Sequence, residues 1–147
     1  MLRTLFASTL LLLALVAAGC AGSSRDDFAD QVRASRDRTD AALENMARSQ
    51  SVDELLERLR TAADEARGAA DDLDQVDPPD ELEDEADRLS SAFRALADEV
   101  EATAEALADV DFESPIEGLD FRNWNSVQDA LAELRNQGID VPPLERR

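Results

Sequence analysis

Cys20 is the single thiol in the 147-residue sequence, so no internal disulfide can form. His and Lys are absent, which excludes a Ser-His-Asp triad, a Cys-His pair and a Schiff-base lysine. Zinc sites depend mainly on His and Cys, and no glycine-rich phosphate loop is present. We therefore expect no catalytic residue, no cofactor and no enzymatic activity.

Carboxylates are the most abundant reactive groups in the chain. Asp and Glu number 34 against 15 basic residues, giving a formal net charge of −19, which disfavours binding to nucleic-acid phosphates. Residues 71–87 contain no basic residue and ten acids, which are Asp71, Asp72, Asp74, Asp77, Asp80, Glu81, Glu83, Asp84, Glu85 and Asp87.

Two interpretations of this acidic segment differ in function. Divalent cations prefer oxygen ligands, which makes Asp74, Asp77 and Asp80 weak candidates for a cation site. The favoured interpretation is a solvated face whose carboxylates have no counter-charge and repel one another, with no metal bound.

Aromatic residues are few, and three of them cluster late in the chain: Phe112, Phe121 and Trp124. They either plug the end of a helical bundle, which is the favoured interpretation, or form an apolar patch for a partner.

The amino-terminal segment has the layout of a secretory signal. Arg3 precedes an apolar run at residues 5–18, and the small residues 17–19 form its end and the position before Cys20. This run is shorter than the roughly 20 residues that a membrane-spanning helix needs. Residues 1–19 are therefore predicted to be a signal peptide.

The end of that segment, Val16-Ala17-Ala18-Gly19-Cys20, resembles the lipobox of bacterial lipoproteins, although Ala17 stands where the family prefers Leu. The resemblance implies a diacylglyceryl thioether on Cys20 and a protein anchored to the cell membrane by lipid, facing the extracytoplasmic side. Two or more acyl chains hold a protein firmly to a bilayer. The alternative is an ordinary secretory signal with an incidental cysteine.

Helical periodicity dominates the rest of the chain. Helices are predicted at about 26–48, 51–76, 80–110 and 124–137, with Ser51 and Glu54 as a capping box and Pro78-Pro79 as a break. Residues 20–25 are expected to be the lipidated Cys and a tether, 26–138 the helical domain, and 139–147 an extended tail. Gly138 is expected to end the last helix in a Schellman motif.

Short connections favour an all-α, antiparallel three-helix bundle with a short fourth C-terminal helix. Folding the third helix onto the second sets Phe93 against Ala62 and Ala66. The apolar seams repeat in heptads, so coiled-coil packing between chains, and hence a homo-oligomer, stays open.

Two sequence motifs, Asp26-Asp27-Phe28-Ala29 and Asp77-Pro78-Pro79-Asp80-Glu81-Leu82, resemble those of small, uncharacterised helical lipoproteins of high-GC actinobacteria. The resemblance covers roughly residues 1–110 and implies no particular activity. We expect a non-enzymatic, lipid-anchored cell-envelope protein that acts as an interaction or scaffold module with an unknown protein partner. The alternative is an extracytoplasmic lipoprotein that binds a ligand or a divalent cation.

Overall fold

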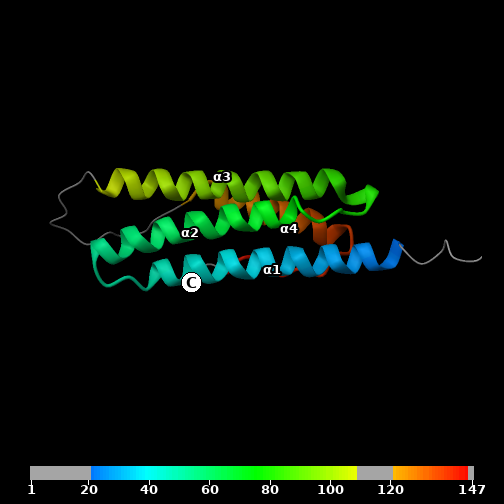
Figure 1. Ribbon diagram of the computed structural model, residues 1–147, viewed down its shortest axis with the longest axis horizontal. Coiled ribbons are helices and arrows are strands. Elements are labelled where there is room, and N and C mark those ends of the chain that lie inside the picture. Colours follow the sequence, from blue (N-terminus) through cyan, green and yellow to red (C-terminus); the bar gives the residue numbers. More distant parts are fainter. Residues whose placement is uncertain (1–20, 109–120, 146–147) are drawn as a thin grey trace, which may run out of the picture.

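The computed structural model describes residues 21–108 and 121–145 (Figure 1). Four α-helices lie in these ranges: α1 (Ala21–Ala47), α2 (Val52–Leu73), α3 (Glu83–Ala108) and α4 (Asn123–Asn136). A 3₁₀ turn, η1 (Asp80–Leu82), precedes α3, and these two ranges contain no strand. The all-α class predicted from the sequence is confirmed.

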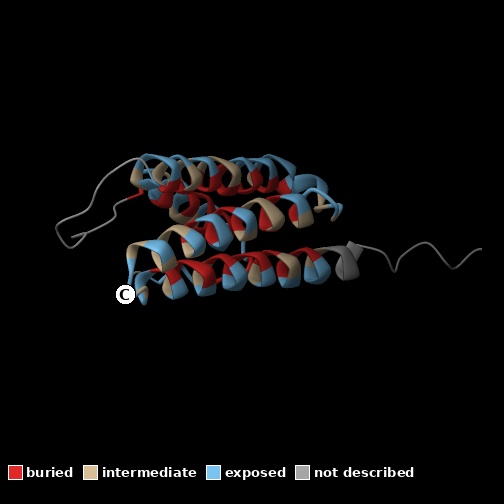
Figure 2. Ribbon diagram, turned by 60° about the vertical axis from the view of Figure 1, so that its left-hand side comes forward, coloured by how far each residue is buried: buried red, intermediate tan, exposed pale blue. Residues whose placement is uncertain are grey.

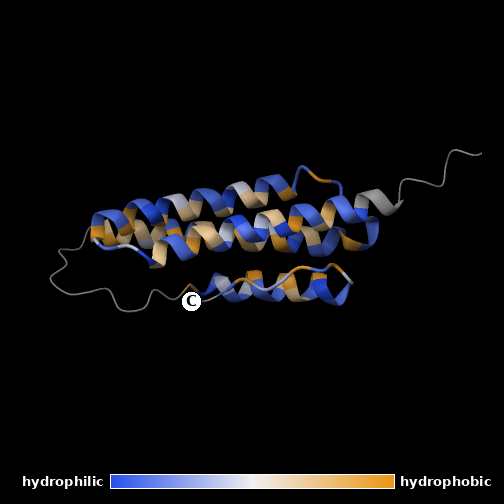
Figure 3. Ribbon diagram, turned by 90° about the horizontal axis from the view of Figure 1, so that it is seen from below, coloured by the Kyte–Doolittle hydropathy of each residue, from blue (hydrophilic) through white to orange (hydrophobic). Residues whose placement is uncertain are grey.

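The three long helices lie side by side with α2 in the middle (Figure 1). The main packing interfaces join α1 to α2, α2 to α3 and α3 to α4, and the α2–α3 interface is the most extensive. Seen from below, α4 and the segment after it form a second layer against this row (Figure 3). The described residues thus form four packed helices, and the antiparallel three-helix arrangement predicted from the sequence is not confirmed.

The buried residues lie on the faces that the helices turn toward one another (Figure 2). Along α3 the apolar positions recur every three or four residues, as a helix with one buried face requires. Phe93 on α3 is fully buried, and Ala62 and Ala66 on α2 are 1% exposed. All three residues are buried, and the contact of the Phe93 ring with Ala62 and Ala66 stays a prediction.

The ends of two helices are fixed by local hydrogen bonds. The backbone N–H of Glu54 donates to Ser51 Oγ at 3.2 Å, and the Glu54 carboxylate accepts from the N–H of Gln50 at 2.8 Å. At the end of α4, Gly138 has φ of +86°, and the N–H of Ile139 donates to the carbonyl of Leu134 at 3.0 Å. The predicted N-cap of α2 and the Schellman end of α4 are both confirmed.

Two helix starts differ from the predicted ones. The first helix begins at Ala21, so the stretch to Arg25 that was assigned to a tether is helical. Arg25 donates to Glu81 at 3.0 Å and to the carbonyl of Gln137, tertiary contacts that a local pattern does not reveal. The third helix starts with the 3₁₀ turn η1. Residues 1–20 and 109–120, including Cys20 and Phe112, lie outside the described residues.

Candidate functional site

The acidic segment 71–87 is less isolated than its sequence suggests. Arg94 on α3 pairs with Asp71 at 3.2 Å and also contacts Asp74. Arg38 on α1 pairs with Asp72 at 2.8 Å, and Arg25 pairs with Glu81 at 3.0 Å. The expectation that these carboxylates lack a counter-charge is therefore wrong for four of them, because the arginines come from other parts of the chain.

Asp74 belongs to a small polar cluster with Ser90 and Arg94. Ser90 is 3% exposed, and its hydroxyl donates to the Asp74 carboxylate at 2.6 Å while accepting from Arg94 at 2.8 Å. The hydrogen bond from Ser90 and the Arg94 guanidinium hold the pKa of Asp74 below its usual value. Asp74 is thus part of the contact between α2 and α3.

The weak cation-site candidates Asp74, Asp77 and Asp80 do not come together as a ligand set. No group of three or more His, Cys, Asp or Glu residues that could hold a metal ion occurs within 21–108 and 121–145. The Asp74 carboxylate is already bound by Ser90 and Arg94, which explains why it does not join Asp77 and Asp80 in a ligand set.

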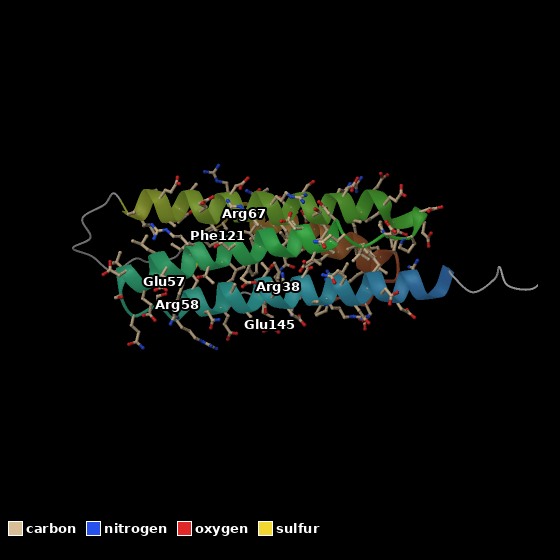
Figure 4. The ribbon with its side chains drawn as sticks, viewed as in Figure 1. Arg38, Glu57, Arg58, Arg67, Phe121 and Glu145 are labelled. Carbon is tan, nitrogen blue, oxygen red and sulfur yellow. The ribbon has the colours of Figure 1, made fainter. Side chains whose placement is uncertain are left out.

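Arginines also tie the remaining helix interfaces together at their rims. Figure 4 labels Arg38 and Arg67, whose guanidinium groups reach from one helix to acids of the next. Arg67 on α2 lies 3.1 Å from Asp98 and also contacts Glu101, both on α3. Arg88 on α3 pairs with Glu133 on α4 at 2.7 Å. These ion pairs are partly exposed and screened by solvent, so each of them contributes little to the stability of the fold.

The aromatic residues serve the core. Phe121 is 6% exposed and Trp124 is 8% exposed, so the described part of the predicted partner patch is not a surface. Glu99 on α3 fixes the entry to α4, because its carboxylate accepts from the N–H groups of Arg122 at 3.0 Å and Asn123 at 2.8 Å. That the aromatic rings plug the end of the bundle stays a prediction.

A shallow, open recess lies between α3 and α4. Its lining consists of small and charged residues, namely Asp87, Arg88, Ser91, Ala92, Ala95, Ser126, Asp129, Ala130 and Glu133. The Arg88–Glu133 ion pair joins two of these residues across it. Among the residues that line the recess, no hydrogen bond joins a nucleophile to a base.

The best-defined polar site surrounds residues 139–145, which we call the tail. Ile139, Val141 and Leu144 are at most 3% exposed and belong to the hydrophobic core. The tail contains neither helix nor strand, and its burial was not foreseen from the sequence. The apolar residues Ile139, Val141 and Leu144 were the signal in the sequence that could have indicated this burial.

The tail is held by side chains of α1 and α4, which we call the tail-binding face: Arg33, Arg36, Asp40 and Gln128. Arg33 donates to the carbonyl of Asp140 at 2.7 Å, and Arg36 donates to that of Pro143 at 3.0 Å. The Asp40 carboxylate accepts from the N–H of Glu145 at 2.7 Å. In Figure 4, Glu145 lies beside α1.

Gln128 on α4 completes the tail-binding face. Its amide donates to the carbonyl of Leu144 at 2.8 Å and accepts from the N–H of the same residue at 3.2 Å. This is the hydrogen-bond pattern that a neighbouring strand would offer to an extended backbone. Sequence reasoning missed all four residues of this face, because nothing in their local pattern distinguishes them from solvated positions.

The comparisons with known proteins supply no family. No family model matches the chain, and no curated protein or solved structure is significantly similar to it. Among the described residues, no helix is both long and apolar enough to cross a membrane.

Proposed function

We propose that this chain is a non-enzymatic, lipid-anchored cell-envelope protein whose helical domain serves as an interaction or scaffold module. The observation that carries the proposal is the lipobox-like run ending at Cys20, which immediately precedes the first residue of α1. A lipid on Cys20 would hold the amino-terminal end of that helix at the membrane surface.

The position of Arg25 supports a defined orientation for such an anchor. Arg25 follows Cys20 by five residues and pairs with Glu81, next to the Pro78-Pro79 turn. That turn would then face the membrane, and the connection between α1 and α2 would lie at the far end of the row (Figure 1). The proposal treats the long helices as an antiparallel three-helix core with α4 as its short fourth member.

A non-enzymatic role fits the chemistry of the described residues. The absence of His and Lys from the sequence removes the usual general bases and amine nucleophiles. Arginines engage several of the carboxylates that could otherwise act in acid–base catalysis, as Arg94 does with Asp74. The cation-binding alternative has no ligand set to support it within the described ranges.

Detergent partitioning of cell extracts tests the proposal. The wild-type protein should enter the detergent phase, and Cys20→Ala should move to the aqueous phase or accumulate with its leader uncleaved. Ser24→Ala, a change in the same segment that spares the thiol, should behave as wild type. Equal partitioning of the wild type and Cys20→Ala, with the leader removed from both, would reject the lipid anchor.

A further inference from the structure

The tail is bound as a peptide ligand would be bound. The hydrogen bonds that Arg33, Arg36, Asp40 and Gln128 make with it all end on its backbone atoms. Side chains of the tail contribute the buried groups of Ile139, Val141 and Leu144. Backbone hydrogen bonds combined with apolar side chains at intervals are the usual means of recognising an extended peptide.

The sequence of the tail lowers the cost of binding it. Pro142 and Pro143 carry no N–H, so two backbone donors that would need partners are missing. Proline also restricts the unbound segment to extended conformations, so less conformational entropy is lost on binding.

The side chains of the tail-binding face are oriented for the contact with the tail. Arg36 is 8% exposed, and its guanidinium is held by Asp37 at 2.7 Å while it donates to the carbonyl of Pro143. Without the tail, Arg36 would lose this acceptor and the apolar residues beneath would meet water. An empty tail-binding face is therefore unfavourable, and another copy of the same segment is the occupant that the observed contacts fit.

Gly138 gives the tail a place to change direction. It lies at the junction of α4 and the tail with φ of +86°, and a residue without Cβ can adopt other backbone conformations at little cost. Each copy of the chain carries one tail and one tail-binding face. If two copies exchanged their tails, both tails and both tail-binding faces would be occupied, and the assembly would stop at a dimer.

We propose that the tail is a detachable ligand, and that the tail-binding face accepts the tail of a second copy of this chain. This inference rests on the interaction-module part of the proposed function and is independent of a lipid on Cys20. In the intact protein a copy's own tail competes at an effective concentration on the order of millimolar, so exchange is visible only when that competition is removed.

Two full-length variants remove the competition. The acceptor carries Val141→Asp and Leu144→Asp, which disable its tail and leave its tail-binding face intact. The donor carries Arg36→Ala and Gln128→Ala, which disable the tail-binding face and leave its tail intact. A matched control donor carries Arg60→Ala and Asn125→Ala, which change one exposed Arg and one exposed amide elsewhere on the helices.

The experiment is capture of untagged donor by tagged acceptor, both purified in detergent. We expect the donor to be retained, the control donor to be retained less because its own tail stays bound, and untagged acceptor to be lost. An excess of synthetic peptide 139–145 should release the donor. Retention of donor no greater than that of untagged acceptor, or retention that the peptide does not reverse, would overturn the proposal.

Circular dichroism of the acceptor shows whether the double substitution leaves the protein folded. If the double substitution removes its helical signal, Leu144→Ala alone replaces it, and the same capture decides the outcome. Repeating the capture with Cys20→Ala in both partners separates this inference from the lipid anchor, because tail exchange should persist when the thiol is absent.

Discussion

At the scale of single residues, arginine makes many of the polar contacts between distant parts of this acidic chain. The sequence shows ten acids without a base in residues 71–87, yet Arg38 and Arg94 reach all three acids nearest the end of α2, which are Asp71, Asp72 and Asp74. Arg94 follows Asp71 by 23 residues, so no local pattern predicts this pairing. The sequence thus revealed the charge of this region but not which carboxylates are engaged.

Asp74 should therefore stabilise the fold, although negative charge near the end of a helix is unfavourable on its own. Asp74→Asn is expected to lower the free energy of unfolding by up to about 1 kcal/mol at neutral pH. Because the folded pKa of Asp74 is lowered, its contribution is present above its ordinary pKa of 3.8 and is lost as the pH falls through the lower folded value.

Urea unfolding of the wild type and Asp74→Asn at neutral and acid pH measures this effect. The two proteins should differ at pH 7 and converge in acid. Asp77→Asn, in the exposed turn that follows, serves as the control and should not be less stable than wild type at neutral pH. A constant difference between wild type and Asp74→Asn across the pH range would contradict the account.

At the scale of helices, the parts that the sequence predicted are those governed by local rules. The buried seams of α2 and α3, the Ser51 cap and the Gly138 end follow from residues close in sequence. Burial of the tail depends on pairs such as Arg36 with Pro143, which are 107 residues apart. Such contacts become visible only when the packing of α1 against the tail is known.

Replacing Gly68 and Gly138 with alanine should change the stability of the protein in opposite directions. Gly68 lies inside α2, where a Cβ would meet Arg38 Nη1 at 3.2 Å, an atom at the end of a flexible side chain that can move aside. Gly68→Ala should therefore stabilise the protein by about 0.5–1 kcal/mol, because alanine is the better helix former.

Gly138→Ala should destabilise the protein by about 1–2 kcal/mol, because φ of +86° is unfavourable for a residue with a Cβ. Thermal unfolding of the two variants beside the wild type checks both signs in one experiment. A stabilising Gly138→Ala would show that α4 does not end in the left-handed conformation described.

At the scale of the whole molecule, a net charge of −19 favours expansion even though arginines cross each helix interface. Sodium chloride should raise the melting temperature, since the screening length falls from about 10 Å at 0.1 M to about 3 Å at 1 M. The ion pairs weaken as well, but the excess of acids decides the sign.

Calcium chloride at matched ionic strength should add nothing further, because the described carboxylates form no set that could hold a metal ion. Differential scanning calorimetry in the two salts makes the comparison. Stabilisation by millimolar calcium well beyond the sodium control would instead restore the cation-binding alternative.

The central claim, that the helical domain is held to a membrane through lipid on Cys20, is tested most directly by mass spectrometry of the amino-terminal peptide of the protein isolated from its native envelope. The account predicts a mature chain that begins at Cys20 and carries a diacylglyceryl group on the sulfur. A mature chain with an unmodified Cys20, or one cleaved at a different residue, would contradict it.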